Sequence, residues 1–170
     1  MARAGLVLRH LVAILVMAIV AMACLRIAGL PISSPLVFNV SGSVPYHVGW
    51  LTRQRGVLPP RGALVLYRYS GEPILGRPEL AEVPFFKFVR GLPGDEVRVE
   101  GRTVYVADGE IGLAMAKTRM GQFLEPISPG RIPDGYFFAA GTLPDSYDSR
   151  YAQSGLIPVH AVIGTVTPFF

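Results

Sequence analysis

A serine in a tight turn is the first residue of this sequence whose setting suits covalent chemistry. Ser43 lies in Ser41-Gly42-Ser43-Val44-Pro45, which follows the apolar stretch Leu36-Val37-Phe38. A turn bounded by glycine and proline exposes the serine hydroxyl and leaves backbone N–H groups free to point at a ligand. Such a hydroxyl becomes a nucleophile when a base removes its proton. Taken alone, however, the segment is more typical of an ordinary loop.

Lys87 is the candidate base, because it interrupts an apolar run. It lies in Val83-Pro84-Phe85-Phe86-Lys87-Phe88-Val89, where strand alternation puts Phe85, Lys87 and Val89 on one face. If that face is buried, the charged amine is disfavoured, its pKa falls, and the neutral amine can act as a general base. The local sequence alone favours a simpler alternative, an edge-strand lysine whose head group reaches water.

Two more polar segments complete the set. Gly91-Leu92-Pro93-Gly94-Asp95 predicts a type II turn at Pro93-Gly94, which would end the strand of Lys87. In Ser146-Tyr147-Asp148-Ser149-Arg150-Tyr151, Asp148 and Arg150 lie two residues apart and are able to hold a loop through a charge-assisted pair. A solvated turn is the alternative for this segment.

Other kinds of catalytic or metal site find little support in the sequence. The histidines are His10, His47 and His160, and only the last two fall outside the N-terminal apolar segment. Neither has a setting typical of a Ser-His-Asp triad, and no metal-ligand spacing is present. The single cysteine, Cys24, excludes an internal disulfide and a cysteine zinc site. We therefore expect no metal and no cofactor.

The elements that must position these side chains are short strands separated by turns. Valines alternate with polar residues on either side of Gly101-Arg102, which predicts a hairpin, and Asp108-Gly109 is a second turn signal. Ile111–Phe123 is a weak helix candidate. The expected strands are Ala63–Tyr67, Pro84–Val89, the hairpin Glu96–Ala107, Tyr136–Ala140 and Val162–Val166. This pattern predicts a small, mostly antiparallel β-domain.

The composition sets the N-terminal segment apart from this domain. Hydrophobic residues make up 51% of the 170 residues and charged residues only 16%, whereas about a quarter is usual for a soluble domain. Leu11–Leu25 is an unbroken apolar run, which as a helix spans roughly 22 Å against a hydrocarbon core of about 30 Å. Arg3, Arg9 and Arg26 flank it, and no acidic residue lies in this segment, a pattern typical of membrane insertion.

The remainder of the chain has no charge pattern that predicts nucleic-acid binding. Three of the sixteen basic residues and none of the twelve acidic ones lie in the first 30 residues, so the rest carries a net charge of +1. No cluster of lysine and arginine with interleaved aromatic residues follows.

Three interpretations of the apolar run stay open. The preferred one is an uncleaved anchor whose N-terminus lies in the cytoplasm. The second is a signal peptide cleaved after Ala21-Met22-Ala23, and the third is lipoprotein processing at Cys24, which the preceding residues fit poorly. All three export the chain from about residue 33 onward.

The order and spacing of these segments resemble the type I signal peptidase family of Ser/Lys proteases, and most of all its conjugative-transfer, pilin-processing (TraF-type) branch. The likeness covers about residues 38 to 166. The matching segments are Ser41-Gly42-Ser43-Val44-Pro45, Arg61-Gly62-Ala63-Leu64-Val65, Lys87 through Gly91-Leu92-Pro93-Gly94-Asp95, Ile132-Pro133-Asp134-Gly135-Tyr136-Phe137, and Gly141 through Ser146-Tyr147-Asp148-Ser149-Arg150-Tyr151.

The resemblance implies a role for each polar residue. Ser43 would be the nucleophile and Lys87 its general base, with the Ser41 hydroxyl and the Ser43 backbone N–H forming the oxyanion hole. Ser146 would orient Lys87. The residues implied to support the site are Asp148 and Arg150, which would hold its loop, and Gly91, Pro93, Gly94 and Asp95.

The resemblance also implies an organisation and a function. Residues 1–10 would form a cytoplasmic N-terminus, 11–32 a transmembrane anchor, and 33–170 an exported β-rich peptidase domain of the signal-peptidase type. The chain would be a single-pass protein of the bacterial inner membrane, in contact with lipid, with its catalytic domain on the periplasmic side. There it would cleave exported precursors such as a conjugative pilin through an acyl-enzyme, with hydrolysis or cyclisation as the outcome.

Departures from the family pattern leave an alternative open. The arginine after the lysine is Phe88, and the aspartate of the strand segment is Ala63. Gly141-Thr142-Leu143-Pro144 replaces the Gly-Asp-Asn-Arg of the housekeeping enzymes, which favours the specialised branch. The alternative is a non-catalytic, membrane-anchored β-domain that scaffolds a secretion or conjugation apparatus. It predicts that Ser43 and Lys87 are far apart or separately solvated.

Overall fold

The computed structural model describes residues 2–27, 35–39, 41–69, 83–118 and 120–169, with the side chains of 2–6 and 22–27 left aside. The chain divides into two units, Met1–Ser34 and Pro35–Phe170. The first unit contains the helix α1 (Ala2–Ile27). Within the described residues, we find no helix with both the length and the apolar character that crossing a membrane requires. Part of the expected anchor, residues 28–32, and the expected domain start at 33 lie outside the described residues.

The second unit is a mostly antiparallel β-domain, as the sequence predicts. Its larger sheet has seven strands in the order β1-β2-β11-β3-β4-β9-β10, and each of its pairings is antiparallel. A short 3₁₀ helix, η2 (Val159–Ala161), precedes the last strand. The strands are β1 (Leu36–Phe38), β2 (Val48–Arg53), β3 (Leu64–Arg68), β4 (Pro84–Gly91), β9 (Tyr136–Ala140), β10 (Ile157–Pro158) and β11 (Val162–Pro168).

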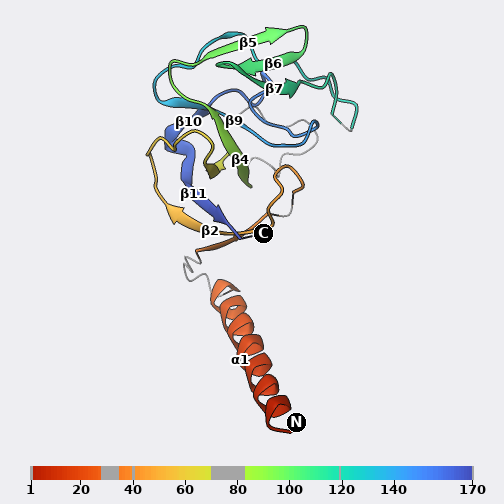
Figure 1. Cartoon of the computed structure of the whole chain (residues 1–170), viewed down its shortest axis with the longest axis vertical. Coiled ribbons are helices and arrows are strands. Elements are labelled where there is room, and N and C mark those ends of the chain that lie inside the picture. The colour runs from red at the N-terminus through yellow and green to blue at the C-terminus, as the bar shows by residue number, and fades with distance from the viewer. Residues whose placement is uncertain (1, 28–34, 40, 70–82, 119, 170) are drawn as a thin grey trace. The chain divides into compact units, whose positions relative to one another are not determined.

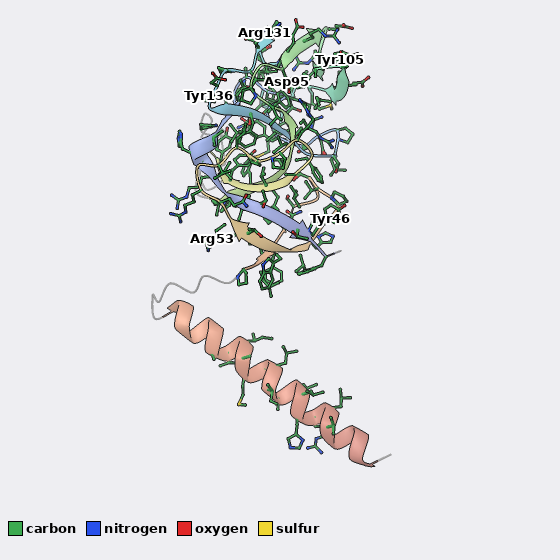
Figure 2. The ribbon with its side chains drawn as sticks, turned by 60° about the vertical axis from the view of Figure 1, so that its left-hand side comes forward. Tyr46, Arg53, Asp95, Tyr105, Arg131 and Tyr136 are labelled. Atoms are coloured by element: carbon green, nitrogen blue, oxygen red, sulfur yellow. The ribbon has the colours of Figure 1, made fainter. Side chains whose placement is uncertain are left out.

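The smaller sheet contains the predicted hairpin. Its order is β7-β6-β5-β8, from β5 (Glu96–Glu100), β6 (Thr103–Val106), β7 (Gly109–Leu113) and β8 (Gly130–Arg131). Glu100 pairs with Thr103, so Gly101-Arg102 forms the two-residue turn that the sequence predicts. This sheet lies at the opposite end of the domain from β2 and β11 (Figure 1). In Figure 2, which is turned by 60° from Figure 1, the labelled side chains of Asp95, Tyr105 and Arg131 lie at one end of this domain and those of Tyr46 and Arg53 at the other.

The helix expected over Ile111–Phe123 is wrong. Its first residues belong to β7, which pairs with β6 from Gly109 to Leu113. Gly112 and Gly121 have φ of 125° and 82°, values that interrupt a right-handed helix. The remainder forms a small hairpin, in which Lys117 pairs with Phe123.

Continuous burial on both faces explains the apolar sequence of β3. Val65 and Tyr67 enter one hydrophobic cluster together with Val89 of β4, whereas Leu64 and Leu66 enter a second cluster on the other face. A strand covered on both sides reads as an unbroken apolar run rather than as an alternation. β4 lies directly beside it, between β3 and β9, and is therefore an inner strand of the sheet.

The turn after β4 fixes where this inner strand ends. Asp95 N–H donates to the Leu92 carbonyl at 3.0 Å, and Gly94 has φ of 87°, as a type II turn requires. The Asp95 carboxylate accepts the Leu92 N–H and a guanidinium N–H of Arg61, both at 2.6 Å. A Cβ at Gly91 would lie 2.6 Å from Ile132 and Val106, so only glycine lets the strand end pass between the two sheets.

Candidate active site

Lys87 is a buried lysine on an inner strand. Its residue is 4% exposed, and it pairs with Val65 of β3. Nζ donates to Ser146 Oγ at 2.7 Å and lies 5.9 Å from the centre of the Phe85 ring. The alternative of an edge-strand lysine is therefore wrong, because β4 pairs with β3 on one side and with β9 on the other.

The surroundings of Lys87 disfavour its positive charge. Burial lowers the pKa of Lys87 from its usual 10.5 to about 8, while the nearby Asp148 opposes this change and Arg150 reinforces it. An amine with this pKa is about one tenth neutral at pH 7 and about half neutral at pH 8. Lys87 can therefore accept a proton near neutral pH, which an ordinary surface lysine does very poorly.

Ser43 lies in a loop that a buried amide organises. Its Oγ is 2.9 Å from Ser41 Oγ. Asn39 Oδ1 accepts the Ser41 N–H at 3.0 Å and the Ser41 hydroxyl at 2.8 Å, and Asn39 Nδ2 donates to the Tyr46 carbonyl at 2.9 Å. Asn39 is 7% exposed, so these bonds join the two sides of the turn in a protected setting. Sequence reasoning missed Asn39, although asparagine before a Ser-Gly turn is a known signal for side-chain-to-backbone hydrogen bonds.

These hydrogen bonds fix the direction of the two serine protons. Asn39 Oδ1 can only accept, so the Ser41 hydroxyl proton points at it. The contact between Ser41 Oγ and Ser43 Oγ then needs its proton from Ser43. In the free protein the Ser43 hydroxyl therefore donates to Ser41 Oγ.

A second loop contacts the serine loop from the end of β9. Thr142 N–H donates to the Ser43 carbonyl at 2.8 Å, and Gly141 N–H donates to Asp148 Oδ2 at 2.9 Å. A Cβ at Gly141 would lie 2.5 Å from the Ser43 carbonyl oxygen and would collide with Ser146 Oγ. Glycine is thus required where the loops carrying Ser43 and Ser146 meet.

Asp148 and Arg150 form the predicted charge-assisted pair, and it is buried. They are 0% and 1% exposed, and Arg150 Nε lies 2.9 Å from Asp148 Oδ1. The guanidinium also donates to the carbonyls of Leu143 and Ser146, both at 2.9 Å. Burial alone would lower the pKa of Arg150, but hydrogen bonding to Asp148 and its charge outweigh burial and raise it. The pair thus ties residues 143–146 into a fixed loop, and a solvated turn is excluded.

A large cleft brings Ser43 and Lys87 to one surface. Its volume is about 970 Å³, enough for several residues of a peptide, and its lining is mainly apolar. Its polar lining includes Asn39, Ser41, Ser43, Lys87 and Ser146. The apolar lining comes chiefly from Phe38, Val83, Phe85, Phe86, Met115, Leu124 and Leu143.

The histidines stand apart from this cleft. Neither His47 nor His160 belongs to its lining, and both are exposed. His47 Nδ1 lies 3.4 Å from the backbone oxygen of Asn39. Among the described residues, no group of three or more His, Cys, Asp and Glu side chains could hold a metal ion.

The family model for signal peptidases, peptidase S26, matches residues 6–170 of the chain. The chain belongs to the signal peptidase S26 family. It is 33% identical over 90 residues to the conjugal transfer protein TraF of Agrobacterium fabrum, a match that covers 51% of this chain. The match covers 49% of the relative, so the chain spans about half the length of this curated relative.

A solved signal peptidase I from Enterococcus faecalis is a more distant neighbour. It shares 18% sequence identity, and the match covers 65% of this chain and 98% of the neighbour, with a TM-score of 0.40.

The departures from the signal peptidase pattern have local structural explanations. Phe88 faces away from Lys87 and packs edge-on against Tyr46, with ring centres 6.4 Å apart. The next arginine along the chain, Arg90, has its guanidinium 5.2 Å from the Phe88 ring centre. Ala63 accepts the Val89 N–H through its backbone at 3.0 Å, which needs no particular side chain.

Proposed function

We propose that this signal peptidase family member is a serine endopeptidase in which Ser43 is the nucleophile and Lys87 the general base. The observation that carries the proposal is the burial of Lys87, with its lowered pKa, in the lining of the same cleft as Ser43. Burying a lysine that is readily neutral costs stability, and such perturbed lysines are typical of functional sites. Accepting the proton of a serine hydroxyl is a function that fits this lysine. The scaffold alternative expects a separately solvated Lys87, which its burial argues against.

The first step is attack on the precursor. The peptide enters the cleft, the Ser43 hydroxyl turns from Ser41 to the neutral Lys87 amine, and Lys87 takes its proton. Ser43 Oγ then forms a bond to the scissile carbonyl carbon, and the carbonyl oxygen becomes an oxyanion. Ser146, 2.7 Å from Lys87 Nζ, keeps the amine oriented while its charge changes.

The Ser43 N–H and the Ser41 hydroxyl stabilise this oxyanion. In the free protein the Ser41 proton points at Asn39 Oδ1, so this hydroxyl has to leave Asn39 and rotate toward the substrate before it can donate to the oxyanion. Losing one such donor costs on the order of 10²–10³ in rate. The Thr142 hydrogen bond to the Ser43 carbonyl fixes the backbone from which the Ser43 N–H projects.

The second step releases the acyl-enzyme. Protonated Lys87 gives its proton to the departing amine, and the N-terminal part of the cleaved peptide stays on Ser43 as an ester. Lys87 then takes a proton from water, which attacks the ester carbonyl. As the acyl group leaves as a carboxylic acid, Lys87 returns the proton to Ser43 Oγ and both residues regain their starting forms. An amine in place of water would join peptide ends into a ring, and both outcomes use the same base.

We further propose an exported precursor as substrate and the bacterial inner membrane as location. The similarity to a conjugal transfer protein supports a pilin-like precursor processed on the periplasmic side. The apolar run Leu11–Leu25 within α1, flanked by arginines, supports a membrane anchor in contact with lipid for residues 11–32, with 1–10 in the cytoplasm and 33–170 exported. Since this run is shorter than the hydrocarbon core, the flanking arginines would extend their head groups toward the interfaces.

The test is precursor processing by the full-length chain in cells. Ser43→Ala and Lys87→Met are each expected to abolish conversion of a co-expressed pilin precursor to its mature size. Matched controls are Ser154→Ala, whose buried hydroxyl has no partner among the described residues, and Arg98→Met on the exposed face of β5. Both controls should process normally.

Mass spectrometry separates catalysis from scaffolding. With purified chain and precursor at low pH, the wild-type protein should gain the mass of the N-terminal product on the peptide that contains Ser43. Processing that survives in both Ser43→Ala and Lys87→Met would show that the chain supports another peptidase, and the proposed dyad would be wrong.

A further inference from the structure

We propose that Lys117 recognises a carboxylate side chain of the precursor, so that the cleft prefers peptides with an acidic residue near the cleaved bond. This inference rests on the proposed peptidase function for the identity of the ligand, and on the geometry of the cleft for the role of Lys117. Lys87 and Lys117 are the two lysines of the whole sequence, and both line the cleft. Lys87 is buried at the candidate catalytic end, whereas Lys117 is exposed.

Lys117 lies on a small hairpin that follows β7. It pairs with Phe123, and Thr118 N–H donates to the Gln122 carbonyl at 2.8 Å. At the base, Leu124 N–H donates to the Ala116 carbonyl at 3.0 Å. The hairpin therefore holds Lys117 at a defined register beside the cleft.

Arg102 fixes both sides of this hairpin to the domain. Its guanidinium donates to the carbonyls of Ala114 at 2.7 Å, Met115 at 2.9 Å and Leu124 at 2.6 Å. Met115 N–H donates to Tyr151 Oη at 3.2 Å, and the Tyr151 ring stacks on Tyr147 with ring centres 5.5 Å apart. Since Tyr147 follows Ser146, this series of contacts runs from the partner of Lys87 to the hairpin of Lys117.

The Lys117 ammonium is positioned but not neutralised. It lies 4.5 Å from the centre of the Phe123 ring, and no carboxylate within ion-pair distance of it is found among the described residues. Asp145, the acidic residue of the cleft lining, is close enough to Arg150 to help raise the pKa of that guanidinium. A carboxylate on a bound peptide would therefore meet a cation that is already held in place by an aromatic ring.

The apolar lining sets the rest of the preference. An extended peptide advances about 3.3 Å per residue and turns alternate side chains to opposite sides. Apolar side chains would enter the aromatic part of the cleft around Phe85 and Phe86, and one acidic side chain would reach the hairpin. A solvent-exposed ion pair of this kind changes affinity by about two- to fivefold.

The experiment measures peptide binding separately from cleavage. Fluorescein-labelled alanine- and leucine-rich peptides carry a single Glu, or Gln as its neutral match, at successive positions. Their affinity for the full-length Ser43→Ala protein is measured by fluorescence anisotropy, so binding does not depend on turnover. We expect one position at which Glu binds about two- to fivefold tighter than Gln.

The variants assign that preference to Lys117. Lys117→Met should bind the Glu and Gln peptides equally, Lys117→Arg should keep the preference, and Lys117→Glu should favour a Lys peptide. Arg98→Met, on the exposed face of β5, is the control for overall charge. Equal binding of Glu and Gln at every position, or the same preference in Lys117→Met, would overturn the inference. If the Glu preference is observed but the wild-type protein cleaves no precursor, the result would count against the proposed peptidase and not against the role of Lys117.

Discussion

At the scale of single residues, the account depends on the protonation of Lys87. The neutral amine is the active form, so kcat/KM should rise with pH and level off above about pH 8, where the amine is mostly neutral. Below that value it should fall about tenfold per pH unit. A pH–rate profile on a fluorogenic precursor peptide measures this. A limb with a midpoint near 6.5, typical of histidine, would instead point to His47 or His160.

The same residue makes stability depend on pH. The pKa of Lys87 is lower in the folded chain than the usual 10.5, so the unfolded chain binds more protons between these values, and stability rises with pH. We expect a slope approaching about 1.4 kcal/mol per pH unit between about pH 8 and pH 9.5. Lys87→Met should lose this slope. Urea unfolding at several pH values checks it, and equal slopes in both proteins would show that Lys87 is not perturbed.

Tyr67 limits that measurement at its upper end. Burial and the charge of Asp148 raise the pKa of Tyr67 well above its usual 10. The unfolded chain therefore loses this proton first, and stability falls as pH rises above about 10. The contribution of Lys87 to the pH dependence of stability should therefore be measured below the pH at which Tyr67 begins to contribute.

Alternation along one strand was enough to predict which residues share a face with Lys87, and the polar segments alone predicted the Asp148–Arg150 pair. Burial of Lys87 could not be predicted, because it depends on β4 lying between β3 and β9, strands far away in the sequence. Asn39 was missed for a similar reason: its importance comes from the hydrogen bonds that its amide makes to Ser41, Val44 and Tyr46 once the turn has formed.

At the scale of elements, the site is the meeting point of two loops. Gly141→Ala should separate them, because the added methyl group collides with Ser146 Oγ and the Ser43 carbonyl. Overpacking of this kind costs about 1–3 kcal/mol, and a shift of either loop should lower kcat by at least about tenfold. Thermal unfolding and peptide cleavage measure the two effects. Gly109→Ala is the matched control, since the nearest atom to its added Cβ would be 3.7 Å away. Equal unfolding temperatures and equal kcat values for the two variants would contradict the close contact at Gly141.

The serine loop should depend on Asn39. Asn39→Ala removes the acceptor of the Ser41 N–H and hydroxyl and the donor to Tyr46, so we expect a loss of about 1–3 kcal/mol in the free energy of unfolding. Asn39→Asp keeps the acceptor but loses the donor, and should recover part of kcat. Chemical denaturation measures the effect on stability, and steady-state kinetics measure the effect on kcat. An Asn39→Ala protein with unchanged kcat would contradict the role of Asn39 in positioning the serine loop.

Turn chemistry was the part of the fold most accessible from sequence. Gly101-Arg102 and Pro93-Gly94 form the turns that their residue types predict. The helix expected over Ile111–Phe123 failed because its glycines adopt positive φ and its first three residues belong to an edge strand of a sheet. The segment starts as a strand instead, because Gly109–Leu113 pairs with the neighbouring strand β6 in a hairpin.

At the scale of the whole molecule, the proposed anchor can be tested without touching the site. Replacing Val16 and Ile19, both exposed apolar residues of α1, by arginine should release the full-length chain from membranes. Each arginine near the centre of an inserted helix costs about 2.5–3.5 kcal/mol. Carbonate extraction of a membrane fraction measures retention. Val57→Arg, at an exposed position of the β-domain, is the control and should stay in the membrane fraction. If carbonate releases the wild-type chain from the membranes, the proposed anchor is wrong.

The protonation of Lys87 can be measured directly, because Lys87 and Lys117 are the two lysines of the sequence. In protein labelled with ¹³C-lysine, NMR titration of the side-chain Cε signals reports each amine separately, and Lys117→Arg assigns the signal of Lys87. If Lys87 is the general base, its signal should titrate near pH 8. A Lys87 signal that titrates near 10.5, as in an exposed lysine, would contradict its role as the base that activates Ser43.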